Sequence, residues 1–307
     1  DGHTNVIAAD GLLPSEEMIK KSGNAAFKDD SFDFIITNPP FGSSVKQTER
    51  AYMQQYRMAV KKEDWLDVKR QGEKSRASQS TEVMFIEQCY KLLKPGGYLA
   101  IVIPDGILTN SSLQYVRDQI EDWFRIVAVI SMPQDAFAHT GAGVKSSVMF
   151  LRKLTTQRSD ALQAQKTALQ NQLLKNQKFE QKIADWEKEK KQILKNHTGF
   201  DADGVVNTTG KTEKKDIEAS REFKDWKAEI NAEHNQKIND LKKQLADLYL
   251  EEKQKALEDH PLFMAIAEKI GYDATGKSIA QNDLHSIGEE LSRFLSAQQK
   301  DETDFFD

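Results

Sequence analysis

Four residues that follow a short apolar run, Asn38-Pro39-Pro40-Phe41, carry the strongest chemical signal in the sequence. The run before them, Asp33–Thr37, is typical of a buried strand, and ligands of open α/β sheets bind at the carboxyl ends of strands. The two prolines fix φ and remove two backbone donors, so the carbonyl groups here can face a ligand. The sequence therefore predicts a binding site at this point. The alternative is a proline-rich turn with Phe41 in the core.

Other candidate residues stand near the ends of predicted strands. Asp10 ends the first apolar run and Pro104-Asp105-Gly106 ends a later one, and each is also compatible with a plain turn. Phe137 precedes the loop His139–Gly143, and its alternative is an ordinary hydrophobic contact. His139 has no histidine or cysteine near it in the sequence, so we expect no metal site there.

The elements that must position these residues are short apolar runs alternating with helical stretches up to residue 153. This alternation is typical of a parallel sheet with crossover helices. The strand candidates are Val6–Ala9, Phe32–Thr37, Tyr98–Ile103, Ile126–Ser131 and Ser147–Leu151. Periodicity predicts a helix over Thr81–Leu93, with Gln88 near its apolar face, and a second helix capped by Ser111 or Ser112.

Residues 154–259 have a different composition, rich in Lys, Glu, Gln, Leu and Ala. From Phe223 to Leu248 apolar residues recur at steps of three or four, which indicates the seam of a coiled coil. The stretch Asn196–Lys211 is polar and contains glycines but no such seam. We therefore predict two long helices that fold back on one another as an antiparallel hairpin, serving either as a solvated spacer or as a docking arm.

Apolar residues return after Pro261. We expect the run 262–267 to rejoin the globular part beside the strand that ends near Leu151, followed by a last helix over Asp283–Ala297 and an acidic tail. The expected domains are thus a partial catalytic domain over 1–153, the hairpin over 154–259, and a return to the first domain over 260–307.

Composition excludes several classes of function. The formal net charge is −5, so the chain lacks the global basic field of many DNA-binding proteins, and a nucleic-acid role must come from a local site or from a partner. The single cysteine, Cys89, excludes an intrachain disulfide. No apolar run approaches the roughly 20 residues that cross a bilayer. We expect a soluble cytoplasmic protein with no membrane partner.

The motif Asn38–Phe41 resembles the catalytic motif of methyltransferases that act on amino or amide nitrogens. The runs TEVMFIEQCYKLLKPGGYLAIVIPDGIL, SLQYVRDQI, AFAHTGAGVKSSVMFL and PLFMAIAEKIGYDATGK follow it. Together, in this order, they resemble the N-6 adenine DNA methyltransferases that form the methylation (M) subunit of type I restriction–modification systems. The resemblance covers residues 1–153 and 260–297. It implies an α/β, Rossmann-like S-adenosylmethionine-dependent methyltransferase fold, truncated at its N-terminus, with the predicted coiled-coil hairpin as an insertion.

The resemblance also implies roles for individual residues. The side-chain oxygen of Asn38 and the backbone carbonyl of Pro39 would hold the amino group of an adenine flipped out of the DNA duplex. Phe41 would stack on that base, and Phe137 matches a region that lines the target-base pocket. S-adenosyl-L-methionine is the implied cofactor, with Asp10 facing its adenine and the motif close to its methyl group.

One expected element of this family does not occur in the sequence. The family has a glycine-rich turn and then an acidic residue that together hold the cofactor, and neither precedes the motif here. We therefore expect the chain to begin at the third strand of the fold, to have an exposed sheet edge, and to be inactive by itself.

The resemblance implies DNA as a partner, together with a specificity subunit and, in some complexes, a restriction subunit. A methyltransferase with the same motif that acts on RNA or on a protein glutamine is the first alternative. A vestigial core whose hairpin serves as an interaction module is the second.

Overall fold

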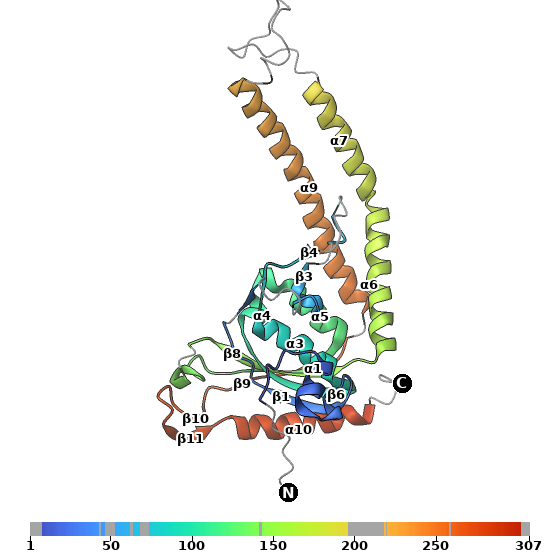
Figure 1. The fold of residues 1–307 in the computed structure, drawn as a ribbon. Helices are drawn as coiled ribbons and strands as arrows, with labels where there is room; N and C mark the ends of the chain where they lie inside the picture. Colours follow the sequence, from blue (N-terminus) through green and yellow to red (C-terminus); the bar gives the residue numbers. More distant parts are fainter. Residues whose placement is uncertain are drawn as a thin grey trace, which may run out of the picture. The chain divides into compact units, whose positions relative to one another are not determined.

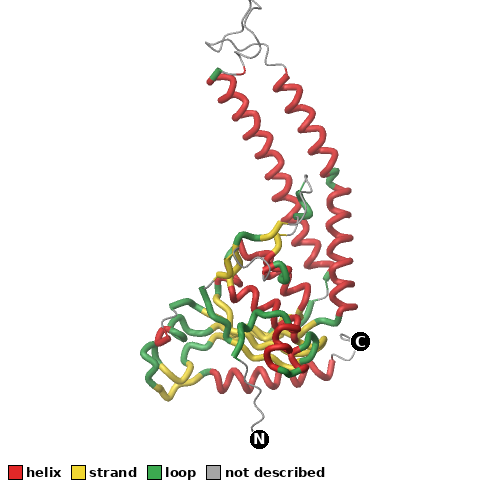
Figure 2. The backbone as a smooth tube through the Cα atoms, viewed as in Figure 1, coloured by secondary structure: helices red, strands yellow, loops and turns green. Residues whose placement is uncertain are grey.

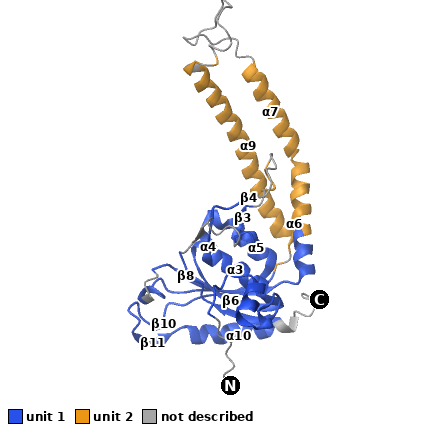
Figure 3. Ribbon diagram, viewed as in Figure 1, with its two compact units in different colours: residues 1–62, 72–163, 260–307 blue, residues 63–71, 164–259 orange. Residues whose placement is uncertain are grey.

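The computed structural model describes residues 8–42, 44–46, 53–61, 64–67, 74–140, 143–195, 218, 220–257 and 259–301. Packing divides the chain into two compact units (Figure 3). Unit 1 comprises residues 1–62, 72–163 and 260–307, and unit 2 comprises residues 63–71 and 164–259. The expected domain boundaries at 153 and 259 remain predictions. The inclusion of residues 63–71 in unit 2 was not anticipated from the sequence.

A five-stranded sheet forms the centre of unit 1 (Figure 2). Its strands, in spatial order, are β1 (Phe32–Thr37), β6 (Leu93–Pro104), β8 (Ser146–Lys153), β7 (Phe124–Ser131) and β9 (Phe263–Ile266). The pairs β1–β6 and β7–β9 are parallel, whereas β8 is antiparallel to both of its neighbours. The expectation of a parallel sheet is therefore wrong in part. The connection from β7 to β8 contains only the short 3-10 helix η5 (Ala138–Thr140), so the chain turns back without a crossover helix.

Helices cover both faces of this sheet. On one face, α3 (Thr81–Leu92) and α5 (Gln114–Trp123) pack their apolar stripes against alternate residues of the strands. The fully buried residues of this core include Val83, Ile86, Leu99, Ile101, Ile103, Val116, Ile120 and Leu151. On the other face, Leu291 of α10 (Leu284–Asp301) packs against Ala128 and Ile130. The core thus lies between the sheet and its helices, as the hydrophobic pattern indicates.

The return segment joins the sheet at a different place from the one expected. Strand β9 pairs with β7, not with β8, the strand that contains Leu151. The reason is geometric, because both edges of β8 are already occupied by β6 and β7. A small hairpin of β10 (Ile270–Tyr272) and β11 (Ser278–Asn282) then leads into α10.

Several expected features meet the structure only in part. Of the expected strand Val6–Ala9, the first two residues lie outside the described residues, and Ala8 and Ala9 are not in a strand. The expected helix over Thr81–Leu93 is α3, and Leu93 is already the first residue of β6. The second helix is α5, whose N-cap position is Leu113 and not a serine, with no side-chain cap hydrogen bond. Asn110 caps the preceding 3-10 turn η4 (Ser111–Leu113), where its side chain accepts the N–H of Ser112.

The remaining elements of unit 1 are short. Those outside the sheet are α1 (Ser15–Ser22), η1 (Ala25–Phe27), β2 (Ser44–Lys46), η3 (Arg57–Ala59), β3 (Val60–Lys61), β4 (Lys74–Ser75), β5 (Ser78–Ser80) and α4 (Gly106–Thr109). Strand β2 pairs with β5 and β3 pairs with β4, both antiparallel. These pairs form a ladder in the segment that joins β1 to α3, which we call the motif loop (residues 43–80).

Long helices make up most of unit 2. They are α6 (Thr156–Asn176), whose first residues belong to unit 1, α7 (Phe179–Lys195) and α9 (Arg221–Ala256). Helices α7 and α9 lie side by side and run in opposite directions (Figure 1). Leu173, Phe179, Ile183, Leu241 and Leu245 are buried in one apolar cluster. The supercoil of a coiled coil remains a prediction, and the expected tip Asn196–Lys211 lies outside the described residues.

In the described part of the chain, no helix is both long enough and apolar enough to span a membrane.

Candidate functional site

Strand β1 carries the motif at its carboxyl end, where the chain leaves the sheet. Asn38 and Pro40 are exposed, Pro39 is buried and Phe41 is partly buried. The side-chain amide of Asn38 is therefore accessible to a ligand, and Phe41 is not a core residue as in the proline-turn interpretation. Among the described strands β1 pairs with β6 alone, and Ile36 is 78% exposed on it. The motif thus stands at an open edge of the sheet.

A close approach of two strands fixes β1 in this position. A β-carbon at Gly97 of β6 would lie 2.4 Å from a side-chain carbon of Leu93 and 3.0 Å from the backbone oxygen of Asp33. Only glycine fits there, because the second contact is to backbone atoms that cannot move aside. Gly97 therefore allows β6 to pack closely against β1, the strand that carries the motif.

Thr81, the first residue of α3, holds the motif from outside the sheet. Its hydroxyl donates a hydrogen bond to the carbonyl oxygen of Pro40 at 2.9 Å. This contact joins residues 41 positions apart in the sequence and fixes the peptide that follows Pro40. Nothing in the local pattern singles out Thr81 beyond its place at the start of a predicted helix.

Helix α3 also positions the segment that contains Asp10. A β-carbon at Gly11 would lie 3.1 Å from ring carbons of Phe85, so the backbone beside Asp10 packs directly on this ring. Phe85 is one helical turn beyond Thr81, a rise of about 6 Å along the axis, and on the same face. The structure therefore brings the motif and the segment of Asp10 to neighbouring turns of one helix.

The carboxylate of Asp10 is exposed and organises its own turn. Its Oδ1 accepts a hydrogen bond from the backbone N–H of Leu12 at 3.0 Å. This is the turn-forming role that the sequence allowed as an alternative. The bond uses one of the two carboxylate oxygens, so a role toward a cofactor remains a prediction.

A buried hydrogen-bond network ties this segment to the motif loop. The hydroxyl of Tyr56 lies 2.6 Å from the carbonyl oxygen of Leu12 and 2.8 Å from Oε1 of Gln88. The side-chain amide of Gln88 donates to the carbonyl of Leu13 at 3.0 Å. Burial, reinforced by the charges of Glu87 and Asp10, raises the pKa of Tyr56 well above its ordinary value. The hydroxyl therefore stays protonated and acts as a donor.

Glu87, the neighbour of Gln88 on α3, holds the next part of the motif loop. Its side chain is 1% exposed, and its two carboxylate oxygens accept hydrogen bonds from the backbone N–H groups of Arg57 and Met58 at 2.8 and 2.9 Å. Lys91 lies 3.6 Å from the same carboxylate. A carboxylate that receives two N–H donors is a strong and directional anchor.

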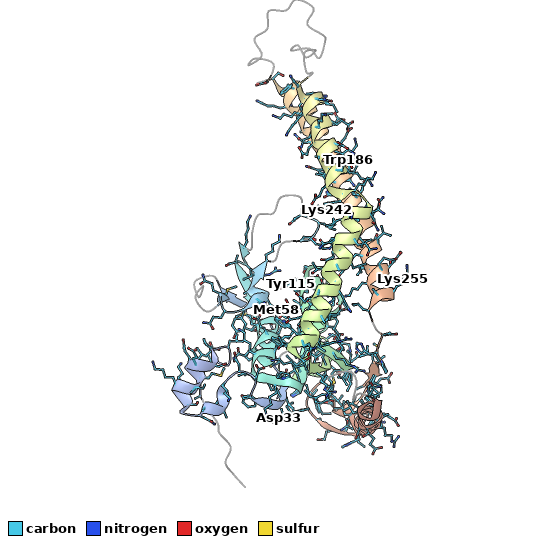
Figure 4. The ribbon with its side chains drawn as sticks, turned by 90° about the vertical axis from the view of Figure 1, so that its right-hand side faces the viewer. Asp33, Met58, Tyr115, Trp186, Lys242 and Lys255 are labelled. Atoms are coloured by element: carbon cyan, nitrogen blue, oxygen red, sulfur yellow. The ribbon has the colours of Figure 1, made fainter. Side chains whose placement is uncertain are left out.

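Gln79 fixes the far arm of the motif loop. Its side-chain amide donates to the carbonyl of Met58 at 2.5 Å and to the hydroxyl of Tyr115 at 2.8 Å. Figure 4 shows Met58 and Tyr115 near one another. The guanidinium of Arg76 lies over the ring of Tyr115, 3.7 Å from its centroid. The two arms of the loop are thus held together and against α5.

Two other predicted site residues follow the carboxyl ends of other strands of the sheet. Asp105 follows β6, the strand next to β1, and accepts a hydrogen bond from the hydroxyl of Ser147 at 2.7 Å. Phe137 lies in the connection from β7 to β8 and packs on a cluster that includes Met132 and Ala136. Strand β7 is three positions from β1, about 14 Å at the usual spacing between strands. The structure therefore groups Asp10, Asp105 and the motif more closely than Phe137.

Sequence reasoning missed the residues that hold the site together, namely Thr81, Glu87, Gln88 and Tyr56. One signal was present, because Glu87 and Gln88 are adjacent polar residues in a helix that is otherwise apolar toward the core. Buried polar side chains need partners, so their position in a core helix indicates a network.

A family model described as N-6 DNA Methylase matches residues 2–237 of the chain. This match covers more than half of the sequence, including the motif, α3 and most of unit 2. The prediction that the chain resembles this family is confirmed.

A protein of Methanocaldococcus jannaschii named as a type II restriction enzyme and methyltransferase is 28% identical over 126 residues. The match covers 41% of this chain and 9% of that protein. The matched part of the chain therefore spans less than a tenth of the length of this curated relative.

Two solved structures are similar to parts of the chain. The M protein of the type I restriction enzyme EcoKI is 19% identical, with a TM-score of 0.30, over 48% of this chain and 24% of that chain. A modification subunit ascribed to a type I restriction enzyme of Vibrio vulnificus YJ016 is 18% identical, with a TM-score of 0.32, over 48% and 26%.

Proposed function

This chain belongs to the N-6 DNA methylase family, and from that premise we propose that it carries the catalytic site of a site-specific DNA adenine-N6 methyltransferase of a restriction–modification system. The observation that carries the proposal is the exposed Asn38 at the carboxyl end of β1, followed by a proline pair whose second carbonyl is held by Thr81. This arrangement presents hydrogen-bond acceptors at the carboxyl end of a strand, where ligands of open α/β sheets bind.

The chemistry of adenine explains why acceptors are needed. Its amino nitrogen is a poor nucleophile because the lone pair is delocalised into the ring, and the duplex hides it until the base is flipped out. We propose that Oδ1 of Asn38 and the carbonyl oxygen of Pro39 accept the two amino hydrogens. They thereby hold the nitrogen in the geometry in which its lone pair points at the methyl donor. Catalysis then comes from orientation and electrostatics without a covalent enzyme intermediate.

Two aromatic side chains complete the proposed pocket. Phe41, partly exposed, would stack on the flipped base, a contact worth about 1–3 kcal/mol by analogy with other base–aromatic pairs. Phe137 would line a more distant wall. The packing of Phe137 against Met132 and Ala136 supports an ordinary hydrophobic role equally well.

S-adenosyl-L-methionine is the proposed cofactor, and it would supply an activated methyl group when bound. The residues present fit one side of such a site. Asp10 offers an exposed carboxylate with one oxygen outside its own turn, and it belongs to the segment that packs one turn along α3 from the motif. Asn38 and Pro39 would bound the opposite, methyl end of the cofactor.

DNA is the proposed substrate partner, and a specificity subunit is the proposed source of sequence recognition, with a restriction subunit as a further component. The net charge of −5 supports a separate DNA-recognition subunit, because a protein that bound DNA by itself would be expected to carry a basic surface. Methylation of RNA or of a protein glutamine is the runner-up, since the same motif serves all three substrates.

Methylome sequencing of cells with and without the gene tests the proposal. The expected result is N6-methyladenine at one short DNA sequence, present only in cells that carry the gene. DNA methylation that is identical in the two strains, with a methyl group lost from RNA or from a protein glutamine, would move the chain to the alternative substrate class.

A further inference from the structure

Most of the backbone of the motif has little conformational freedom. The rings of Pro39 and Pro40 fix φ at both positions. Asn38 and Pro39 each precede a proline, which confines ψ at both positions to extended values. Between the Cα atoms of Asn38 and Phe41, the backbone torsion that the prolines leave free is therefore ψ of Pro40.

This one torsion decides where Phe41 lies. A proline commonly adopts ψ of about −30° or about +120°, as it does at the second position of type I and type II turns. The two values differ by about 150°, so they send the carbonyl oxygen of Pro40 and the Cα atom of Phe41 in different directions. Only one of them can point the oxygen at a fixed donor. A donor beside Pro40 therefore selects the position of the aromatic ring relative to the amide of Asn38.

Thr81 supplies that donor from a rigid helix. Its hydroxyl lies 2.9 Å from the carbonyl oxygen of Pro40, closer than the 3.5 Å that separates it from the carboxylate of Glu82. Val83 and Met84, two and three residues further along α3, are fully buried. The donor is therefore fixed to the core of unit 1.

The chain beyond Phe41 returns to the same place. Gly42 has a φ of 74°, in the left-handed region that glycine adopts without strain. Strand β2 then pairs with β5 in a register that places Ser44 opposite Ser80, the residue before Thr81. The backbone on the two sides of Phe41 is thus fastened at the start of α3, by the hydroxyl of Thr81 on one side and by strand pairing on the other.

We propose that Thr81 is a positioning residue of this site. Its hydroxyl holds ψ of Pro40 and thereby fixes the direction of the Phe41 ring relative to Asn38. This role depends on the proposed function only for the identity of the ligand, an adenine base. Without the hydroxyl, ψ of Pro40 distributes between its values and the ring spends part of its time away from the base. The loss of activity should be smaller than that caused by removing Asn38, because the acceptors of the amino group stay in place.

Fluorine NMR tests the position of the ring without any measurement of activity. In the full-length gene product, para-fluorophenylalanine replaces Phe41 and reports the surroundings of the ring. Thr81→Val and Thr81→Ala both remove the donor, and we expect both to move the resonance toward the shift of the free amino acid, because the ring samples more than one position. Thr81→Ser keeps the hydroxyl and should keep the wild-type resonance. The use of two variants without the hydroxyl guards against a folding defect that is specific to one of them.

Steady-state methylation of DNA, by the full-length gene product with its partner subunits, measures the consequence for activity. For Thr81→Val we expect kcat/KM for DNA to fall about three- to tenfold, the factor by which one neutral hydrogen bond shifts an equilibrium. KM for the cofactor should stay within about twofold, because uniform binding of that ligand is not altered. Thr81→Ser should recover the wild-type kcat/KM. The matched control is Ser296→Ala on α10, whose exposed hydroxyl also donates to a backbone carbonyl, that of Ser292 at 2.8 Å, and it should leave kcat/KM unchanged.

A double-mutant cycle shows whether Thr81 acts through Phe41. In the Phe41→Ala background, Thr81→Val should lower kcat/KM by less than about twofold, because the ring that Thr81 positions is gone. Equal losses in the two backgrounds, or one unchanged resonance at position 41 in the wild type, Thr81→Val and Thr81→Ala, would overturn the positioning role. A shifted resonance in a protein that never methylates DNA would retain the positioning role and reject the proposed function.

Discussion

At the scale of single residues, the motif was easier to predict than the hydrogen bonds that hold it in place. The motif Asn38–Phe41 is visible in the sequence because few structural needs place an amide, two prolines and an aromatic in that order after a strand. The contact of Thr81 with Pro40 and the two N–H groups accepted by Glu87 were not visible, because they join residues that are tens of positions apart. Such contacts depend on tertiary packing, which local patterns do not encode.

Glu87→Gln tests the network at this scale. The glutamine side chain has one oxygen that can accept a hydrogen bond, whereas its NH2 group is a donor. One of the two backbone N–H groups of Arg57 and Met58 would therefore lose its acceptor. We expect a loss of about 1–3 kcal/mol in the free energy of unfolding, measured by urea denaturation. The control is Glu289→Gln on α10, whose side chain is 73% exposed and should change stability by less than about 0.5 kcal/mol. An equal effect of the two substitutions would contradict the anchoring role of Glu87.

At the scale of elements, the strands and the main helices were predictable because their hydrophobic periods are strong. β1 has the bounds expected from the sequence, and α3 ends one residue earlier than expected. The direction of β8 and the partner of β9 were not predictable, since both depend on which sheet edge is occupied. The packing of Leu66 in unit 2 could not be predicted either, because a lone Trp-Leu pair in a polar loop has no period.

Deletion of residues 157–258 with a short Gly/Ser bridge tests whether the hairpin is separable. Unit 1 should remain folded, because its core is made by the sheet with α3, α5 and α10. Burial raises the pKa of the Cys89 thiol to about 12, so in folded protein at pH 8 the reactive thiolate is rare and hidden. We expect Cys89 to resist a thiol reagent in the deletion variant and to react fully in urea. Rapid labelling without urea would show that the hairpin belongs to the core.

At the scale of the whole molecule, the proposed catalytic site lies on β1, a strand at the edge of the sheet. Among the described strands β1 has a neighbour on one edge only, and the candidate cofactor residues are Asp10, Asn38 and Pro39. No glycine-rich turn precedes the motif in the sequence. The α/β fold class could be predicted from the alternation of short apolar runs with helical stretches and from the family resemblance. The exposed sheet edge was also predicted, but its place beside β1 depends on the order of the strands, which the sequence does not show.

The affinity of the 307-residue chain for its proposed cofactor follows from this arrangement. Backbone groups of a glycine-rich turn normally hold much of such a ligand, and the proposed site has Asp10, Asn38 and Pro39 without such a turn before them in the sequence. We therefore expect isothermal titration of the isolated chain with S-adenosylmethionine to give weak binding, or none. A dissociation constant in the low micromolar range would contradict this expectation.

The central claim is that Asn38 presents an adenine amino group for methylation. The direct test is transfer of a labelled methyl group by the full-length gene product, with its partner subunits, to DNA, RNA and a glutamine-containing protein in parallel. We predict label in DNA alone, recovered as N6-methyladenine, and a fall in kcat of about 10²–10³ for Asn38→Ala with cofactor binding changed by no more than a few-fold. Near-normal turnover by Asn38→Ala, or label in RNA or protein in place of DNA, would contradict the claim.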